Sequence, residues 1–177
     1  MTTLAIDKAG IIEGYASVFG IADLARDVVM AGAFRNSLNR TGIRGVRCLW
    51  QHDPAEPIGV WLSLEEDTRG LFARGQLNLE TQRGRELTAL ITQGAVDGLS
   101  IGFRARRTRR NPRNLNRELL VIDLWEISLV SFPLLPEARL LSRSTRTISP
   151  HAERTISQLS KSLSRQKQIC EFQRRLP

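Results

Sequence analysis

The sequence of 177 residues contains only two cysteines and two histidines. Cys48 and Cys170 lie far apart, so they form neither a disulfide framework nor a paired metal-ligand motif, and we expect two free thiols. One histidine and one cysteine before residue 143 are too few for a usual zinc site. The sequence also lacks a P-loop and a dinucleotide fingerprint, so we predict neither a metal nor a cofactor.

Long apolar runs are absent as well. No stretch approaches the roughly 18 residues that a membrane span needs. Residues 1–10 lack the basic start and apolar core of a secretory signal. We therefore expect a soluble intracellular chain with no membrane partner. Its 41% content of apolar residues is sufficient for one globular domain with an appendage.

The net charge of +8 is distributed unevenly. Residues 143–177 hold eight basic and two acidic residues and are rich in Ser, Thr, Arg and Gln. We predict a domain over residues 1–142 and a basic tail over 143–177, which is either a partner-binding helix or a frayed end. Seven arginines from Arg104 to Arg117, with no acidic residue among them, predict a solvated loop. A surface for an acidic partner or nucleic acid is the alternative.

Strand-like patterns dominate the segment before the tail. β-Branched and aromatic residues concentrate in short runs that Gly, Pro or Asp residues bound, which is typical of strands. Asp67 to Gly70 predict a hairpin turn. The expected strands are residues 11–19, 46–52, 58–64, 71–77, 96–103 and 118–132, the last being one long strand or two with a bend.

Two helices are expected beside these strands. Residues 31–40 place Phe34 and Leu38 on one helical face, and a second helix begins with Asn78 as its cap and ends at Gly94. The strands do not alternate regularly with helices, which argues against a doubly wound sheet. We predict a mainly β (α+β) fold: a closed or nearly closed β-barrel of about seven strands with a few surrounding helices.

His52 is the single histidine before the tail, so any histidine-dependent reaction in the domain has one candidate. It lies in the segment WQHDP, at the end of a predicted strand that runs into a proline turn. Catalytic groups tend to be presented at such strand ends. A structural histidine that packs beside Trp50 is the alternative.

Ser100 lies between Gly98 and Gly102 in the segment GLSIG. Residues two apart on a strand share a face, so the glycines leave the surface around this hydroxyl open to a substrate. An incidental serine in a glycine-rich strand is equally compatible. The segment also matches the G-x-S-x-G elbow of α/β-hydrolases, with Glu126 and His151 in the corresponding order. We reject that version, because the elbow must lead into a helix and His151 lies in the tail.

Three carboxylates are candidates for orienting a catalytic histidine: Asp53, Asp123 and Glu126. Glu126 lies inside an otherwise apolar predicted strand. Burying its charge without a partner would be costly, so a partner is expected. That partner is either His52 or an arginine.

The order of these segments resembles the prohead maturation proteases of tailed bacteriophages, including the forms found in gene transfer agents. Herpesvirus assemblins are distant relatives of that family. Each matching piece is short, and the ordered set carries the resemblance over about residues 11–140. The pieces are GYASVF (14–19), DVVMAGAF (27–34), LWQHD (49–53), PIG (57–59), GL (70–71), GLSIGF (98–103) and the segment 124–138, which ends in LPEA.

The resemblance implies a serine endopeptidase on an assemblin-like β-barrel. It would cut scaffold, or the scaffolding segment of the major capsid protein, inside an immature capsid in the cytoplasm of a bacterial cell. By this similarity Ser100 matches the nucleophile and His52 the histidine, while Glu126 falls where assemblins place a second histidine. Assemblin relatives also imply a homodimer. The alternative is a non-enzymatic capsid-assembly module that holds scaffold or nucleic acid through the arginines and the basic tail.

Overall fold

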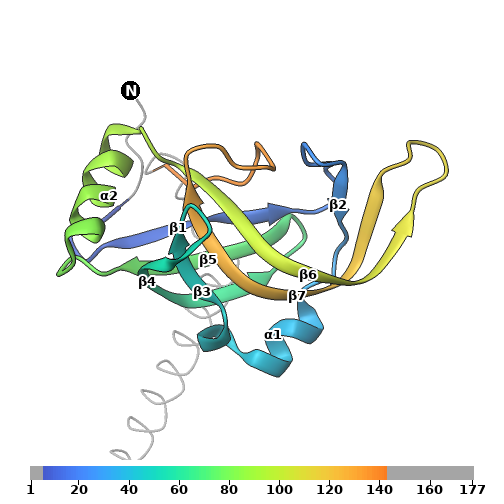
Figure 1. Ribbon diagram of the computed structural model, residues 1–177, viewed down its shortest axis with the longest axis horizontal. Helices are drawn as coiled ribbons and strands as arrows, with labels where there is room; N and C mark the ends of the chain where they lie inside the picture. Colours follow the sequence, from blue (N-terminus) through green and yellow to red (C-terminus); the bar gives the residue numbers. More distant parts are fainter. Residues whose placement is uncertain (1–5, 143–177) are drawn as a thin grey trace, which may run out of the picture. The chain divides into compact units, whose positions relative to one another are not determined.

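The computed structural model describes residues 6–142 (Figure 1). The predicted basic tail, with His151 and Cys170, lies outside the described residues, so its character stays a prediction. The described part contains seven strands, β1 (Ile11–Val18), β2 (Asp27–Val29), β3 (Arg47–Trp50), β4 (Asp53–Glu66), β5 (Gly70–Leu77), β6 (Gly98–Arg110) and β7 (Arg117–Val130). It also contains α1 (Arg35–Thr41), the short 3₁₀ helix η1 (Ile43–Gly45) and α2 (Gln82–Gln93).

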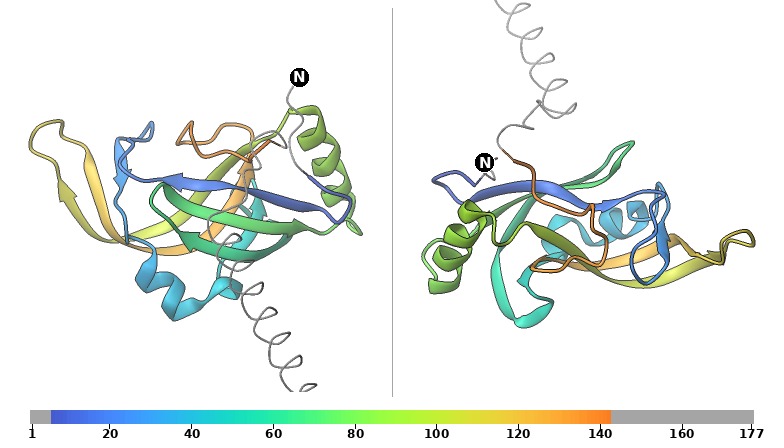
Figure 2. Two further views of the ribbon diagram at one scale, coloured as in Figure 1. Left: turned by 180° about the vertical axis from the view of Figure 1, so that it is seen from behind. Right: turned by 90° about the horizontal axis from the view of Figure 1, so that it is seen from above.

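All seven strands belong to one curled sheet (Figures 1 and 2). Strands β1, β5, β4 and β3 are successive antiparallel neighbours, and β6 pairs antiparallel with β7. Strand β3 runs parallel to one end of β7, while β2 runs parallel to its other end. The long strand β7 therefore joins three other strands, and it places residues from β3 and β6 on either side of its own.

A segment after β7 bridges the two outer strands of the sheet. Leu140 pairs with Gly14 of β1, and Arg139 pairs with Gly98 of β6. A Cβ atom at Gly14 would lie 2.3 Å from the carbonyl oxygen of Arg139, so only glycine permits this approach. The bridge makes the curled sheet a nearly closed barrel, which confirms the predicted fold class.

The barrel is filled by apolar side chains that alternate along its strands. In β5 every second residue from Leu71 to Leu77 is buried, as expected where one face of a strand meets the core. Leu87 and Ile91 of α2 and the fully buried Phe34 before α1 join this core. Other fully buried core residues are Ile12, Ile58, Leu99, Leu119, Ile122, Leu124, Ile127 and Leu129.

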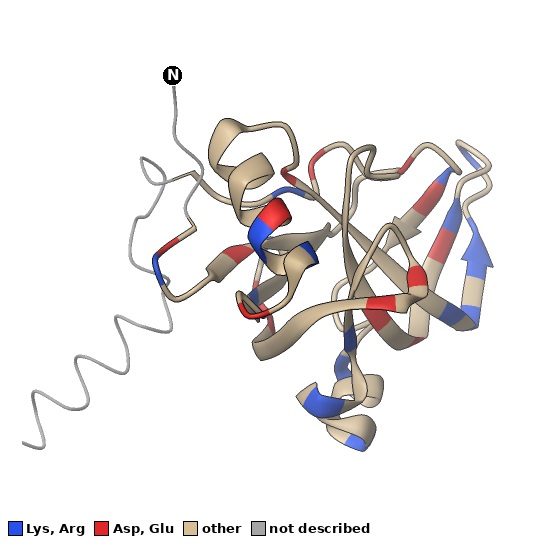
Figure 3. Cartoon of the chain, turned by 60° about the vertical axis from the view of Figure 1, so that its left-hand side comes forward, with Lys and Arg blue, Asp and Glu red and all other residues tan. Residues whose placement is uncertain are grey.

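The arginine-rich segment is a strand, so the predicted loop is wrong. Arg104 to Arg110 continue β6 and pair with β7, and the turn between the strands falls at residues 111–116. Figure 3 shows basic and acidic residues close together on this hairpin. The arginines reach acids that are distant in the sequence, which the local charge pattern does not reveal. The ion pairs are Arg106–Asp123, Arg109–Glu118 and Arg117–Asp27.

Several predicted boundaries also differ from the structure. Strand β4 begins at Asp53 and runs through Pro54 and Pro57, where its pairing with β3 is irregular and the missing N–H groups are tolerated. The short strand β2 was not predicted, because three residues carry no periodic pattern. The first helix begins at Arg35 rather than at residue 31.

The N-cap of α2 is Thr81, and the predicted cap Asn78 is wrong. The Thr81 hydroxyl oxygen accepts a hydrogen bond from the backbone N–H of Gly84 at 3.0 Å. Asn78 lies one turn earlier, where its side-chain oxygen accepts the N–H of Glu80. The helix ends as predicted, at Gly94 in the left-handed conformation.

We expect Thr81→Ala to lower the free energy of unfolding by about 1 kcal/mol, because an N–H group of the first turn loses its acceptor. Urea denaturation measures the change. Thr92→Ala at the other end of α2 is the control, since its hydroxyl only donates to the Thr88 carbonyl oxygen within the helix. Equal effects of the two substitutions would argue against the capping role.

Candidate active site

Three side chains, from β6, β7 and the turn between β3 and β4, form a continuous hydrogen-bonded series. Nε2 of His52 lies 2.9 Å from Oγ of Ser100, and Nδ1 lies 2.6 Å from Oε1 of Glu126. With the proton on Nδ1, the ring donates to Glu126 and accepts the hydroxyl proton of Ser100. The three residues are far apart in the sequence. Strand β7 brings them together, because it pairs with both β3 and β6.

A tight hairpin between β3 and β4 presents His52. Trp50 pairs with Asp53, so Gln51 and His52 are the two central residues of the turn. Their φ angles are 54° and 61°, the left-handed values of a type I′ turn, in which glycine and asparagine are usual. Such a conformation costs about 1–2 kcal/mol for other residues. The hydrogen bond from the Gln51 N–H to the Leu129 carbonyl oxygen, 2.9 Å long, helps to hold it.

Glu126 occupies the space above Gly102. The two residues are opposite each other in the β6–β7 pairing. A Cβ atom at Gly102 would lie 2.0 Å from Oε1 of Glu126, and one at Gly98 would lie 2.6 Å from the carbonyl oxygen of Val130. The interpretation that both glycines leave room for a substrate is therefore wrong. At Gly102 the room is filled by the carboxylate that contacts His52.

Ser128 is a site residue that the sequence analysis missed. Its hydroxyl donates to Oε2 of Glu126 at 2.7 Å and accepts the backbone N–H of His52 at 3.1 Å. The Ser128 side chain is fully buried, so its bond to Glu126 forms away from water. A signal was present, because Ser128 follows Glu126 by two residues and therefore shares its face of the strand.

The other two carboxylate candidates serve elsewhere. Asp53 accepts the backbone N–H of Ala55 at 2.8 Å, and Asp123 forms ion pairs with Arg40 and Arg106. Of the two partners expected for Glu126, the structure places His52 against it.

Hydrogen bonding and burial shift the pKa values of two groups in and near the site. The hydrogen bond to Glu126 raises the pKa of His52 above its usual value, and its partial burial acts in the opposite direction. Cys48, a buried free thiol on β3, has its pKa raised to about 12, chiefly by burial and further by the charge of Glu126. The thiol therefore stays protonated at neutral pH.

The ion pair between His52 and Glu126 links the stability of the fold to pH. The pKa of His52 is higher in the folded chain than in the unfolded chain, so its protonation favours folding. This contribution is fully present below the unfolded-state pKa of about 6.5. It is lost as the pH rises through the folded-state pKa of His52.

We expect Glu126→Gln to lower the pKa of His52, because the imidazolium loses its negative partner. An NMR titration of the ring protons measures this pKa, and His52→Ala identifies the signal among the two histidines. Asp53→Asn is the matched control, since Asp53 is adjacent in the sequence while its side chain bonds to Ala55. A His52 pKa that is the same in wild type and Glu126→Gln would contradict the assigned contact.

The part of the chain that the structure describes has no group of three or more His, Cys, Asp or Glu residues arranged to hold a metal ion. Over the same residues, none of the helices is both long and apolar enough to cross a membrane.

A hydroxyl, an imidazole and a carboxylate in this order are the arrangement that serine hydrolases use. The chain belongs to the caudovirus prohead serine protease family, whose sequence profile matches residues 2–154. The family predicted from the sequence is thereby confirmed. The prohead protease of Enterobacteria phage HK97 is 40% identical over 129 residues, which are 71% of this chain and 56% of that protein. The chain thus spans little more than half the length of this relative.

Two solved structures share the fold at low sequence identity. The capsid assembly protease of bacteriophage T4 has a TM-score of 0.58 and 12% identity, with coverage of 75% of this chain and 90% of that one. The KSHV protease, in complex with a hexapeptide phosphonate inhibitor, has a TM-score of 0.56 and 14% identity, with coverage of 86% and 76%. The herpesvirus protease likeness agrees with the assemblin-like barrel predicted from the sequence.

Proposed function

We propose that this chain is a serine endopeptidase with Ser100 as nucleophile, His52 as general base and acid, and Glu126 as the residue that orients His52. The observation that carries the proposal is the series of contacts from Ser100 through His52 to Glu126, 2.9 Å and 2.6 Å long. Membership of a serine protease family supports the same assignment.

In this mechanism Oγ of Ser100 attacks the carbonyl carbon of the scissile peptide bond while Nε2 of His52 takes the hydroxyl proton. The tetrahedral intermediate collapses as His52 returns that proton to the leaving amine, and an acyl-enzyme remains. Water then attacks the ester with the same help from His52. Glu126 fixes the Nδ1 proton and stabilises the imidazolium. General acid and base catalysis of this kind contributes about 10²–10⁴-fold to the rate.

The proposed substrate is scaffold, or the scaffolding segment of the major capsid protein, in an immature capsid within a bacterial cell. The family description as a prohead protease and the T4 relative's description as a capsid assembly protease support this substrate class. A homodimer is proposed only by analogy with assemblins. Nucleic acid is not proposed as the main partner, since three of the arginines from Arg104 to Arg117 form ion pairs with acids.

Labelling with a fluorophosphonate, together with cleavage of a co-expressed capsid precursor, tests the proposal. We expect the probe to modify Ser100 in the wild type and to fail in His52→Ala. Mass spectrometry is expected to find a shortened capsid protein when the wild type is present. An unlabelled Ser100 together with an intact precursor would favour the non-enzymatic assembly module.

A further inference from the structure

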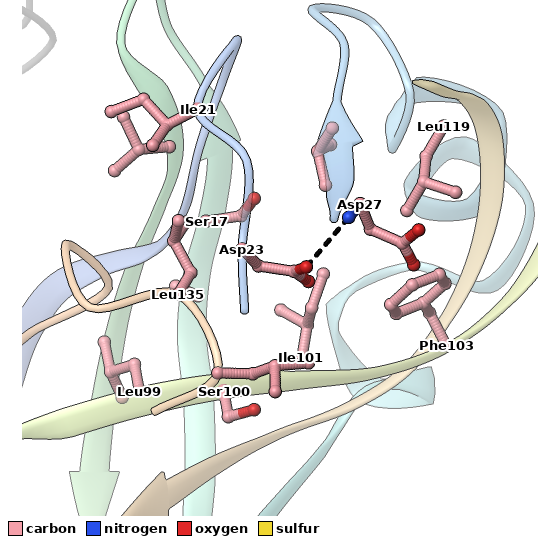
Figure 4. A pocket seen from close by; sticks show the side chains of 14 residues that line it. Ser17, Ile21, Asp23, Asp27, Leu99, Ser100, Ile101, Phe103, Leu119 and Leu135 are labelled. Carbon is pink, nitrogen blue, oxygen red and sulfur yellow. Dashed lines mark hydrogen bonds between the residues drawn. The ribbon is translucent and has the colours of Figure 1, made fainter. Parts of the chain in front are cut away.

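A pocket lies beside Ser100, between the segment that leads into β2 and the first residues of β6 (Figure 4). Most of its walls are apolar, so they suit the aliphatic part of a long side chain. The main apolar residues are Ile21, Leu99, Ile101, Phe103, Leu119 and Leu135.

Two acidic residues are the titratable groups that line this pocket, and their charges are not equally compensated. Arg117 binds both carboxylate oxygens of Asp27, which neutralises that side chain. Asp23 instead accepts two backbone N–H groups, those of Ala25 and Asp27, and both bonds go to Oδ1. Its Oδ2 accepts no hydrogen bond from the described residues. The charge of Arg117 also acts on Asp23, but one guanidinium faces two carboxylates, so one negative charge is left over in formal terms.

Ser17 supplies a second observation that is independent of Asp23. Its side chain lines the same pocket and is 2% exposed. Among the side chains that the structure describes, its Oγ is the buried polar atom without a hydrogen-bond partner. A buried hydroxyl without a partner costs free energy, and a donor that enters the pocket would relieve this cost.

The pocket lies on the opposite side of β6 from the catalytic hydroxyl. In Figure 4 the oxygen of Ser100 points away from Asp23, while Ile101 extends toward it. Side chains of an extended peptide also alternate between two faces. A peptide that runs alongside β6 would present its scissile bond to Ser100 on one face and a neighbouring side chain to this pocket on the other, and the pocket would then be a specificity subsite.

We propose that this pocket binds a basic side chain of the substrate, a lysine or arginine near the scissile bond, with Asp23 as the ionic partner and Ser17 as a second acceptor. The proposal rests on the proposed peptidase function. An apolar wall around an acidic end matches a side chain with an aliphatic stem and a cationic tip. Burial also raises the pKa of Asp23, and a bound cation would act against this shift.

Cleavage-site profiling with a peptide library tests the subsite. We expect the wild type to require lysine or arginine at one position close to the cleaved bond. A lysine peptide is expected to exceed the same peptide with methionine by about 10- to 100-fold in kcat/KM, the range that one pocket contact commonly gives. Asp23→Asn should bring this ratio close to one, and Ser17→Ala should reduce it in part.

Asp7→Asn is the matched control. Asp7 likewise accepts the N–H groups two and four residues ahead of it, those of Ala9 and Ile11, but it does not line the pocket. Its variant should keep the wild-type lysine-to-methionine ratio. Cleavage by the wild type without a basic preference, or an Asp23→Asn enzyme that keeps the preference, would overturn the subsite alone. A wild type that cleaves nothing would overturn the peptidase function as well.

Discussion

Ser100→Ala is expected to lower kcat/KM for cleavage of a capsid precursor by about 10⁴-fold or more, because the substitution removes the proposed nucleophile. The expected loss is large, because without this hydroxyl His52 and Glu126 have no nucleophile to activate. The Ser100 hydroxyl contacts His52 at the half-buried surface of β6, so its removal opens no cavity in the core. We therefore expect the free energy of unfolding to change by no more than about 0.5 kcal/mol.

Mass spectrometry of the precursor after co-expression measures the loss, and urea denaturation measures the stability. Ser63→Ala is the control, since Ser63 is a half-buried serine on β4 that pairs with β5, and it should cut like the wild type. Cutting by Ser100→Ala at the wild-type rate would reject Ser100 as the nucleophile.

Gly102→Ala is expected to lower kcat/KM by about 10²–10⁴-fold, comparable with the loss of the general acid and base contribution. The new methyl group would lie 2.0 Å from Oε1 and 2.7 Å from the carboxyl carbon of Glu126, so that side chain must move. His52 then loses the contact that orients its ring. Steady-state kinetics on a peptide or precursor substrate measure the effect.

A double-mutant cycle separates this cause from general damage to β6. In a Glu126→Ala background no carboxylate lies above residue 102, so adding Gly102→Ala should change kcat/KM little. Non-additivity of this kind is expected for residues that act through one contact. If the two substitutions reduce kcat/KM independently, the methyl group acts by another route.

The sequence was sufficient to predict the barrel class, the family and the three side chains that converge. Histidine is so scarce that His52 had no competitor within the domain. Glu126 is a carboxylate in an otherwise apolar strand, so it required a partner. His52 was one of the two partners expected for it. The meeting of these residues depends on strands that lie far apart in the sequence, so spacing alone could suggest it but not establish it.

The errors arose where pairing between strands decides the structure. The role of Gly102 depends on which residue of β7 lies opposite, and register is not visible in one strand's own sequence. The arginines from Arg104 onward were expected in a solvated loop. They are exposed, but they lie on a strand that pairs with β7, where Asp123 and Glu118 form ion pairs with two of them. Ser128 carries no charge, so its place in an apolar strand does not by itself require a partner, and its role depends on how Glu126 and His52 are placed around it.

The turn that carries His52 has a consequence for the evolution of the chain. With only Gln51 and His52 between the paired residues Trp50 and Asp53, adding or deleting one amino acid would rotate the imidazole away from its neighbours. Insertions and deletions among natural relatives are therefore expected to be rare in this turn. It can accumulate at residues 111–116, since that tip projects from the barrel (Figure 1) and carries none of the catalytic candidates.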